Sequence, residues 1–489
     1  MTDFAGKRVH LMGIGGSGVS ALVPLLQSRG AIVSGCDATI SAMTRLLGST
    51  GVPVACGHHA DHVHDVDLVV HTAALADDHP ELQAARERRI PVLGRGACLV
   101  ALMAGARTIA VSGSHGKTST TWFIGHLLAE SGADPVVMVG GAVGALGGGG
   151  ARVGRGGLFV AEVDESDGSF AGVRPTIAVV TNLDHEHLRH YGSFANLEIA
   201  FNGWLHTVPA DGLAVVPTTG LSERVTSGVR APLLRVGLDA GDCHATELAL
   251  GADGSRCRVI LHGQDIGELI VPIPGAHMVT NALMAVAAAR FAHLSSSLMA
   301  LATCERVRRR FLVHGTAAGV RVVEDYGHHP SEIRATIAAA RLAGGRVHVL
   351  FQPHRFTRTH DCFTEFVAAF DQAHRVALLP VYGAGETPIP GATSAVLAAA
   401  VTLRRSGEDD LTVLATAERA TAVTFIAQGA LPGDTVLILG AGDVGECAQQ
   451  VLDFFHPGRR EPAMASGPDV ADLVKSSQTL TLEKACVPC

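Results

Sequence analysis

The chain contains very little lysine. Only four lysines occur among its 489 residues, at Lys7, Lys117, Lys475 and Lys484. Base composition of the coding sequence is the ordinary explanation for such a bias towards arginine. Lys117 is nevertheless the only lysine between residues 8 and 474, so a compact ammonium group stands where arginine is used everywhere else. This contrast draws attention to residue 117.

Other features are also missing. No run of 18 or more apolar residues without charges occurs, and residues 1–6 are polar with no long apolar segment of the signal-peptide kind, so we expect neither a membrane span nor a signal peptide. The net charge of −8 disfavours a nucleic-acid-binding surface, which is usually basic. The chain has ten cysteines, and no framework of close pairs occurs in the first 480 residues, which is typical of a cytoplasmic protein. Cys486 and Cys489 form a C-x-x-C, but the second pair of a metal site is absent.

Glycine and aliphatic residues are abundant. The chain has 57 glycines and 47% hydrophobic residues, with only 4% aromatics, a balance typical of α/β domains with many glycine-containing turns. Its pattern predicts three α/β domains and a disordered tail or linker, at 1–105, 106–316, 317–456 and 457–489. The first and third domains are predicted to be Rossmann-like, and the central one to hold a parallel sheet behind a phosphate-binding loop.

Each domain opens with a strand, a turn and a helix. Strands are predicted at 8–13, 31–35, 68–70, 91–93, 108–111, 157–161, 176–181, 319–323, 347–351, 375–379 and 435–439. Residues 213–273 are strand-like and interrupted by glycines. Helices are predicted up to about Ser28 and at 279–291 and 331–343, with Ser331 as the N-cap of the last.

The strongest local motif follows the strand at 108–111. It consists of Gly113, Ser114, His115, Gly116, Lys117, Thr118 and Ser119. Backbone N–H groups and the helix dipole at such a turn attract phosphate, so Lys117 would reach the terminal phosphates of a nucleotide and Thr118 would hold Mg²⁺. Val111 replaces the first glycine of a complete phosphate-loop motif, and Gly-Lys-Thr at a helix start also occurs by chance.

Two polar stretches follow later strands. Residues 162–167 contain four carboxylates, which repel one another unless they are solvated or share a cation. Their place at the carboxyl end of a strand favours Mg²⁺. Residues 181–191 contain His185, His187 and His190, without zinc-finger spacing. One histidine beside the carboxylates as a Mg²⁺ or Mn²⁺ ligand is the economical interpretation, and a polar surface loop is the alternative.

Taken in order, residues 113–118, 161–167 and 181–187 resemble the ATP-binding domain of the Mur ligase family. Motifs similar to this family continue at 277–281, 309–311, 325–330, 351–359, 382–386 and 440–443. Those at 325–330 and 351–359 resemble the alanine-adding members. The resemblance covers residues 7–456, and several spaced motifs in one order are more specific than any single motif. Met278 departs from the family, which usually has Asn there.

The resemblance implies roles for individual residues. Residues 113–119 would bind ATP. Thr118, Glu162 and His187 would hold the metal ion. Asn281 and Asp325 would contact the adenosine portion of ATP, and Arg310 its γ-phosphate. The remaining implied roles are substrate-carboxylate binding by His354, Arg355 and Arg358, and proton acceptance by His329 or His354.

The first glycine loop has two interpretations. Gly13, Gly15 and Gly18 followed by Asp37 fit a nicotinamide dinucleotide site. In the resembled family the same loop binds the diphosphate of UDP, which we favour. The implied UDP-sugar site comprises Gly13, Gly15, Gly16, Ser17, Gly18, Asp37 and Arg95.

The resemblance also implies a reaction. ATP would phosphorylate the lactyl carboxylate of UDP-N-acetylmuramate, and the amine of L-alanine would attack the acyl phosphate, in peptidoglycan precursor synthesis. The enzyme would be a monomer or weak homodimer. Four alternatives remain: a family member attaching a peptide in wall recycling, a paralogue acting on another sugar acid, an NAD-dependent oxidoreductase, and a catalytically silent nucleotide-binding regulator.

Overall fold

The chain divides into two compact units, Met1–Arg308 and Arg309–Cys489. The computed structural model describes residues 3–72, 74–76, 78–166, 168–186, 188–292, 297–405 and 412–456. His187 and the predicted tail at 457–489 lie outside these ranges. Among the described residues, no helix combines the length and apolarity needed to cross a bilayer.

The first sheet of unit 1 is parallel throughout and has the order β3-β2-β1-β4-β5. Its strands are β1 (Arg8–Met12), β2 (Ile32–Asp37), β3 (Val54–Cys56), β4 (Leu68–His71) and β5 (Val92–Gly94). Val9 and Leu11 pack with the helices on one face, and Met12 packs with those on the other. This order is the predicted Rossmann-like arrangement.

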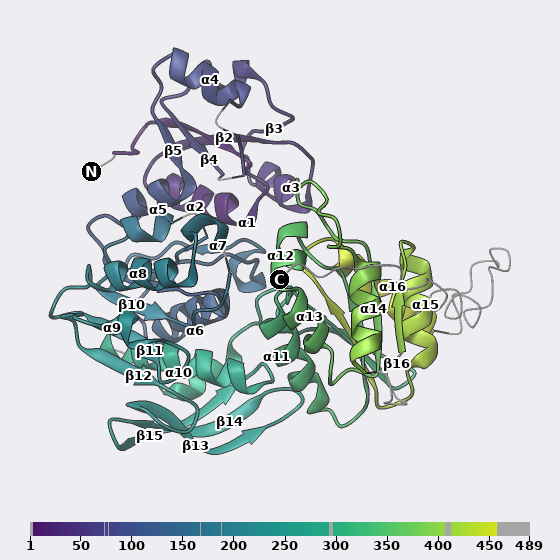
Figure 1. The fold of residues 1–489 in the computed structure, drawn as a ribbon. Helices are drawn as coiled ribbons and strands as arrows, with labels where there is room; N and C mark the ends of the chain where they lie inside the picture. The colour runs from purple at the N-terminus through teal and green to yellow at the C-terminus, as the bar shows by residue number, and fades with distance from the viewer. Residues whose placement is uncertain are drawn as a thin grey trace. The chain divides into compact units, whose positions relative to one another are not determined.

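Helices cover both faces of this sheet (Figure 1). The first face carries α1 (Ser17–Ser20), α2 (Leu22–Ser28) and α5 (Arg95–Met103). The second carries α4 (Pro80–Glu87) and the 3₁₀ turn η1 (Ala60–Val63). Helix α3 (Ala42–Ser49) follows β2.

The second sheet of unit 1 has ten strands in the order β15-β14-β13-β12-β11-β10-β6-β9-β7-β8. They are β6 (Arg107–Ser112), β7 (Val136–Met138), β8 (Ala151–Arg152), β9 (Leu158–Glu162), β10 (Ile177–Val180), β11 (Leu213–Pro217), β12 (Leu233–Val236), β13 (Cys243–Leu250), β14 (Ser255–Leu261) and β15 (Gln264–Val271). The predicted parallel core is confirmed from β13 to β7, whereas β14, β15 and β8 add antiparallel pairs at the edges.

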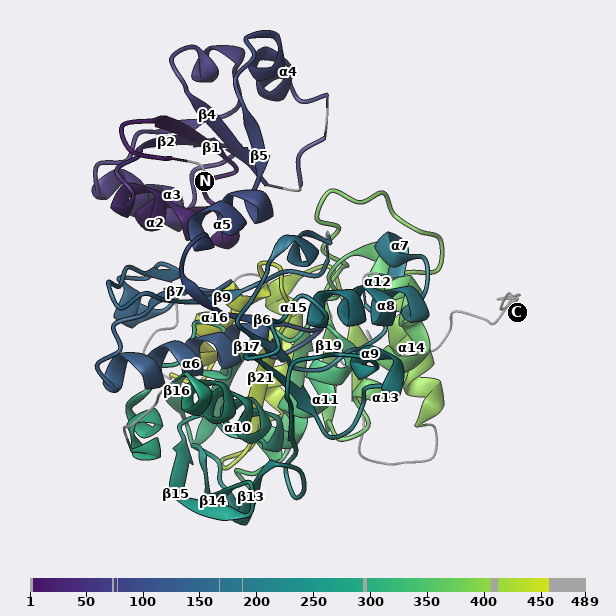
Figure 2. The same cartoon turned by 90° about the vertical axis from the view of Figure 1, so that its left-hand side faces the viewer.

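Two buried helices, α6 (Lys117–Glu130) and α10 (Ala276–Phe291), pack together on this sheet (Figure 2). The other elements are η2 (Gly144–Leu146), η3 (Ser169–Gly172), α7 (Leu188–Tyr191), α8 (Phe194–Leu205), α9 (Glu223–Thr226) and η4 (Leu298–Thr303). The two sheets share one apolar core, in which Leu99 of α5 and Phe170 of η3 belong to the same cluster. This common core explains why they form one unit.

Unit 2 contains a third sheet with the order β16-β17-β21-β18-β19-β20. Its strands are β16 (Leu312–Ala317), β17 (Val320–Asp325), β18 (Val347–Phe351), β19 (Arg375–Leu378), β20 (Thr412–Ala415) and β21 (Thr435–Leu439). Only β16 is antiparallel. The helices are α11 (Pro330–Arg341), α12 (Phe356–Asp361), α13 (Phe363–Ala369), α14 (Ser394–Arg404), α15 (Arg419–Gly429), η5 (Val444–Glu446) and α16 (Cys447–Phe454).

The prediction that Ser331 caps α11 is wrong, because the cap is His329. His329 has an extended backbone, and its Nδ1 accepts the N–H of Ser331 at 3.4 Å. The carboxylate of Glu332 accepts the N–H of His329 at 3.2 Å, which completes a capping box. Pro330 occupies the first helical position, where its missing N–H costs nothing.

Candidate active site

The loop between β6 and α6 requires glycine at two positions. Gly113 has φ of 129° and Gly116, the N-cap of α6, has φ of 80°. A Cβ atom at Gly113 would lie 2.3 Å from Thr181 Oγ1, and one at Gly116 would lie 2.7 Å from Asn281 Oδ1. No side chain caps α6. The loop therefore adopts its shape through close backbone approach, as a phosphate-binding turn does.

Residues 181–184 hold this loop in place. Asn182 Oδ1 accepts the N–H of His115 at 2.9 Å, and Asn182 Nδ2 donates to the carbonyl of His115 at 3.0 Å. The N–H of Ser114 donates to the carbonyl of Asn182 at 3.0 Å, and the Ser114 hydroxyl accepts the N–H of Asp184 at 2.9 Å. The amides of 114 and 115 are thus engaged. Those of 116–119 lie in the first helical turn, where the helix itself offers no acceptor.

Lys117 folds back over the loop. Its Nζ donates to the carbonyls of Gly113 at 2.6 Å and Ser114 at 3.2 Å, and to Glu165 Oε1 at 2.8 Å. Burial alone would lower the pKa of Lys117, but the carboxylates of 165, 164 and 162 outweigh it and raise that pKa. Burial raises the pKa of Glu165 against the opposing effect of Lys117. Lys117 therefore stays protonated, and Glu165 is a partner to which sequence reasoning assigned no role.

Glu162 and Thr118 border the same short segment. Strand β9 lies beside β6, and their register places Glu162 opposite Val111 at the carboxyl end of the sheet. Glu162 Oε2 accepts the N–H of Gly140 at 2.7 Å, while a Cβ atom at Gly141 would lie 3.3 Å from Thr118 Cγ2. The two predicted metal ligands in the described residues thus lie beside adjacent residues, Gly140 and Gly141.

Asn281 reaches the loop from α10. The side chain is buried, and its amide lies against Gly116. Asn281 Nδ2 donates to Met278 Sδ at 3.8 Å, so the unusual methionine helps to orient Asn281. The structure therefore brings the predicted adenosine contact to the predicted phosphate loop.

The first glycine loop is held by Asp37 and Arg95. Asp37 Oδ2 accepts the N–H of Gly15 at 2.9 Å. A Cβ atom at Gly18 would lie 2.9 Å from Arg95 Cδ, so the guanidinium stem covers this glycine. Gly16 precedes α1 as its N-cap. The predicted UDP-sugar residues are thus gathered around one turn.

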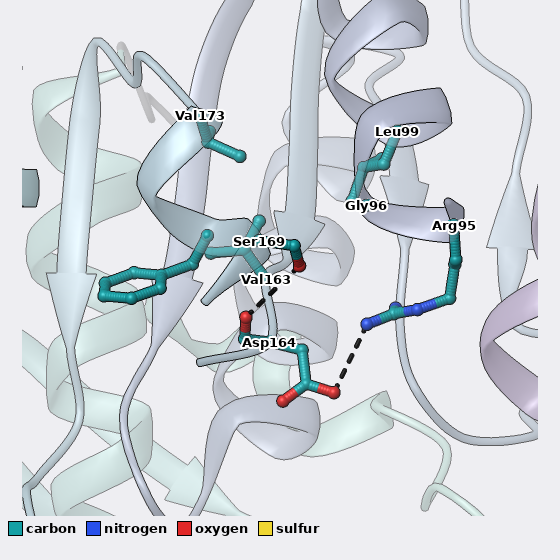
Figure 3. Close-up of a pocket in the computed structure, with 8 residues that line it drawn as sticks. Arg95, Gly96, Leu99, Val163, Asp164, Ser169 and Val173 are labelled. Carbon is teal, nitrogen blue, oxygen red and sulfur yellow. Dashed lines mark hydrogen bonds and ion pairs between the residues drawn. The ribbon is translucent and has the colours of Figure 1, made fainter. Parts of the chain in front are cut away.

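Arg95 also connects this loop with the acidic run (Figure 3). Its Nη2 lies 3.2 Å from Asp164 Oδ2. Burial would raise the pKa of Asp164, but Lys117 and Arg95 lower it overall. A small pocket lies beside the pair, with Gly96 and Leu99 of α5 on one side and Ser169 of η3 on the other. Asp164 therefore interacts with the cations of both predicted phosphate loops.

Unit 2 collects its predicted residues at one edge of the third sheet. The register places Asp325 and Phe351 on either side of Leu439, where three parallel strands end. Arg309 Nη2 donates to the carbonyls of Gly440 at 2.5 Å and Gly442 at 3.0 Å. Segments 325–330, 352–358 and 440–442 therefore follow adjacent strands.

Arg310 and Asp325 are placed differently within this edge. The Arg310 guanidinium lies 5.0 Å from the ring centroid of Tyr326, a cation–π arrangement. Asp325 is buried and accepts the N–H groups of Phe311 and Gly327, each at 2.7 Å. Burial raises the pKa of Asp325, and Arg310 opposes this. Within unit 2, Asp325 therefore holds the backbone at Phe311 and Gly327 in place.

His354, Arg355 and Arg358 lie at the start of α12. The His354 ring stacks on Tyr382 with centroids 5.6 Å apart, and Arg358 Nη1 lies 3.5 Å from His354 Nδ1. Burial lowers the pKa of His354 to about 4, and both arginines act in the same direction, so the imidazole is neutral at pH 7. Arg355 has φ of 71° and lies 3.4 Å from Glu386 Oε1. The turn at Arg355 thus places one neutral imidazole and two guanidinium groups at the start of α12.

Replacing Gly116 with alanine should damage the phosphate loop more than the matched change Gly132→Ala at the other end of α6. Both glycines have φ near +80°, but a Cβ atom at Gly132 meets nothing within 4 Å. The backbone strain of about 1–3 kcal/mol is common to both variants. Any additional loss of stability in Gly116→Ala therefore results from the close approach of Asn281 to residue 116. Thermal unfolding and ATP-binding measurements should show the larger loss for Gly116→Ala. Equal losses would contradict the required close approach.

Comparisons with known proteins cover nearly the whole chain. Family models match "Mur ligase family, catalytic domain" at residues 8–107, "Mur ligase middle domain" at 111–289 and "Mur ligase, glutamate ligase domain" at 309–442. The chain is 42% identical to a UDP-N-acetylmuramate–L-alanine ligase of Sorangium cellulosum, over 91% of this chain and 95% of that protein. It is also 42% identical to a protein of that name from Acidothermus cellulolyticus, over 92% and 95%.

Two solved structures are similar to this chain over most of its length. The crystal structure of UDP-N-acetylmuramate-alanine ligase MurC from Thermotoga maritima is similar with a TM-score of 0.76 and 27% identity, covering 92% of this chain and 99% of that one. A murein peptide ligase from Psychrobacter arcticus has the same fold, with a TM-score of 0.65 and 22% identity over 93% and 100% of the two chains.

Proposed function

The chain belongs to the Mur ligase family, and we propose that it joins L-alanine to the lactyl carboxylate of UDP-N-acetylmuramate at the expense of ATP. The relatives that share 42% identity over most of the chain carry the name of this activity. The reaction belongs to peptidoglycan precursor synthesis in the cytoplasm, and the enzyme works as a monomer or weak homodimer.

The observation that carries the proposal is the position of Lys117. An ammonium group lies over a glycine loop at a helix start, beside the acidic ends of neighbouring strands. This arrangement suits the terminal phosphates of a nucleotide, because the first-turn amides and the ammonium attract the same charge. We therefore assign ATP to the domain at 106–316.

The other substrates are assigned to the outer domains. UDP-N-acetylmuramate binds at 1–105 through the turn at 13–18, with Asp37 and Arg95 supporting it. L-Alanine binds at 317–456, where His354, Arg355 and Arg358 hold carboxylates; arginine suits this because its planar fork binds a carboxylate bidentately. Asn281 and Asp325 serve the adenosine portion of ATP, and Arg310 its γ-phosphate.

The residues present fit a divalent metal ion. Glu162 offers a carboxylate and Thr118 a hydroxyl, which are the oxygen ligands that Mg²⁺ prefers, and both border residues 140–141. His187 completes the proposed set. Bound there, Mg²⁺ would neutralise charge on the phosphates. Mn²⁺ prefers similar ligands.

The chemistry needs an activated carboxylate, since a free carboxylate is a poor electrophile. Transfer of the γ-phosphoryl group gives an acyl phosphate. The amine of L-alanine attacks its carbonyl carbon, and phosphate leaves. Lys117 and Arg310 stabilise the charge that develops on the phosphate oxygens. His354 is neutral at pH 7, so it can accept the amine proton, and His329 is the second candidate.

Phosphate release tests the proposal directly. The assay contains ATP, Mg²⁺ and UDP-N-acetylmuramate, with L-alanine, glycine, L-serine or a tripeptide as the amine. L-Alanine should give the highest kcat/KM. Preference for the tripeptide would assign the chain to wall recycling, and phosphate release only with another sugar acid would assign it to a specialised paralogue. An absorbance change with a nicotinamide cofactor, or no turnover with any amine, would refute the ligase assignment.

Replacing Arg355 with alanine should raise the KM for one carboxylate substrate about 10- to 100-fold and leave the KM for ATP within about twofold, because a bidentate charge-assisted pair contributes roughly 1.5–3 kcal/mol. Arg419→Ala is the matched control, since that guanidinium pairs with Asp443 and Glu446 in the same unit. Initial-rate kinetics with each substrate varied in turn measure the three KM values. Equal changes for all three substrates would contradict the assignment.

A further inference from the structure

A second cluster of polar side chains lies within the first domain, on the α4 face of the first sheet. It contains His10 of β1, Cys36 of β2, His58 before η1, His62 of η1 and Glu81 of α4. Ligand atoms of His10, Cys36, His62 and Glu81 all lie within 4.8 Å of one another. None of these residues takes part in the proposed ligase chemistry.

The spacing around Cys36 matches a small tetrahedral ion. Cys36 Sγ lies 3.4 Å from His10 Nε2, 3.3 Å from His58 Nδ1 and 3.2 Å from Glu81 Oε2, and His58 Nδ1 lies 3.3 Å from Glu81 Oε2. A zinc ion with bonds of about 2.3 Å to sulfur and about 2.0–2.1 Å to nitrogen or oxygen separates its ligands by roughly 3.3–3.6 Å. The His58–Glu81 separation of 3.3 Å falls in that range, and the three separations from Cys36 Sγ are roughly 0.1–0.4 Å shorter than the upper part of the range that applies to pairs with sulfur.

Glu81 is the second observation. Its side chain is fully buried, and an ionised carboxylate there needs a compensating charge. Among the described residues, its hydrogen-bonding and ion-pair partners are the imidazoles of His58 and His62, the Cys36 thiol and the N–H of His59. No lysine or arginine is among them. A divalent cation would use the same thiol, carboxylate and imidazole atoms as ligands.

The surroundings resemble those of a bound metal. Ser34 Oγ lies 3.0 Å from Nδ1 of His10, which leaves Nε2 facing Cys36; metal-ligating imidazoles usually have such a partner on the other nitrogen. His62 Nδ1 lies 2.6 Å from Glu81 Oε1, a hydrogen-bond distance that fixes the carboxylate.

We propose that this cluster binds one zinc ion through Cys36, Glu81 and two of the imidazoles of His10, His58 and His62. Thiolate, imidazole and carboxylate are the ligand types that zinc uses. Binding displaces the thiol proton to solvent, because only the thiolate coordinates the metal. The ion ties β2 and α4 to the segments that carry the two imidazoles, and its role is structural.

The site also supports the first glycine loop. The carbonyl of Cys36 accepts the N–H groups of Gly13 at 2.9 Å and Ile14 at 3.1 Å. Zinc binding at the side chain of Cys36 therefore stiffens the residue that holds the start of this loop. Removal of the ion should lower the unfolding temperature and loosen residues 13–18.

Metal analysis of the full chain tests the inference. The untagged protein carrying Cys486→Ser and Cys489→Ser is offered one equivalent of zinc, dialysed, and analysed by plasma mass spectrometry without ATP. About one zinc per chain should remain. Cys36→Ser and Glu81→Gln should each weaken binding by about 10- to 100-fold or more. Cys98→Ser, at a buried cysteine of α5 in the same domain, is the matched control and should retain the ion.

Cobalt gives an independent measurement that does not depend on a destabilised variant. Co²⁺ bound at this site should show thiolate charge-transfer absorption in the parent protein and in Cys98→Ser, and Cys36→Ser should lack it. Absence of zinc uptake by the parent protein would overturn the proposal. The side chains of the cluster would then be held by hydrogen bonds to one another alone. Equal zinc content in the parent, Cys36→Ser and Glu81→Gln would overturn it too. Neither result bears on the ligase proposal, which phosphate release tests separately.

Discussion

Replacing Lys117 with methionine should lower kcat by about 1000-fold or more while the affinity for UDP-N-acetylmuramate changes by less than about threefold. The loss is this large because the ammonium faces charge that develops in the transition state, where removal of even one stabilising donor costs about 100- to 1000-fold. Initial-rate phosphate release and calorimetric binding of the UDP-sugar measure the two quantities. The contacts of Asp37 and Arg95 with the first glycine loop do not include Lys117, which is connected with Arg95 only through Asp164.

Stability must be separated from catalysis in this experiment. Lys117 forms a buried ion pair with Glu165, and removal of one partner of such a pair costs about 3–5 kcal/mol. The double variant Lys117→Met/Glu165→Gln removes both charges, so its unfolding temperature should recover towards that of the parent. Its turnover should not recover. Restored turnover in the double variant, or near-normal kcat in Lys117→Met, would show that Lys117 is structural only.

Replacing Glu162 with glutamine should lower kcat about 100- to 1000-fold at ordinary Mg²⁺ concentrations and raise the Mg²⁺ concentration needed for half-maximal rate. Glutamine keeps an oxygen for the N–H of Gly140, which Glu162 accepts at 2.7 Å, so the local fold is preserved. What is lost is the negative charge that attracts a divalent ion. The rate should therefore rise with added Mg²⁺ or Mn²⁺, in a titration over several orders of magnitude.

A matched charge change elsewhere in the same unit controls for electrostatics at a distance. Glu198 is a buried carboxylate of α8 that lies 3.5 Å from Arg224, and Glu198→Gln should leave the Mg²⁺ requirement unchanged. If Glu162→Gln showed a parent-like Mg²⁺ titration, Glu162 would not be a ligand. A parent-like kcat would also remove it from the active site.

Much of this protein can be predicted from local sequence. An apolar run followed by glycines and then a helical pattern predicts a strand, a turn and a helix, because each depends on neighbouring residues. Strands β1, β6 and β18 therefore lie within a residue or two of their predicted bounds, and the three sheets follow one another along the chain as predicted. Gly113 and Gly116 are recognisable in the same way.

Local sequence patterns do not predict which of several chemically suitable residues takes a given role. Ser331 is a good N-cap by type, yet α11 begins at Pro330 and its N-cap is His329, whose ring accepts the N–H of Ser331. The acidic run at 162–167 offered several carboxylates to a metal and to Lys117. Spacing alone could not decide which would bond to Lys117.

By itself, the sequence determined the three α/β domains, the two glycine loops and the family, since these depend on residue type and order along the chain. Only the tertiary structure decided which side chains meet. Lys117 and Glu165 are 48 residues apart, and the cluster around Cys36 joins β1, β2, η1 and α4. Such meetings depend on strand order and register, which place distant residues side by side, and no local periodicity encodes them.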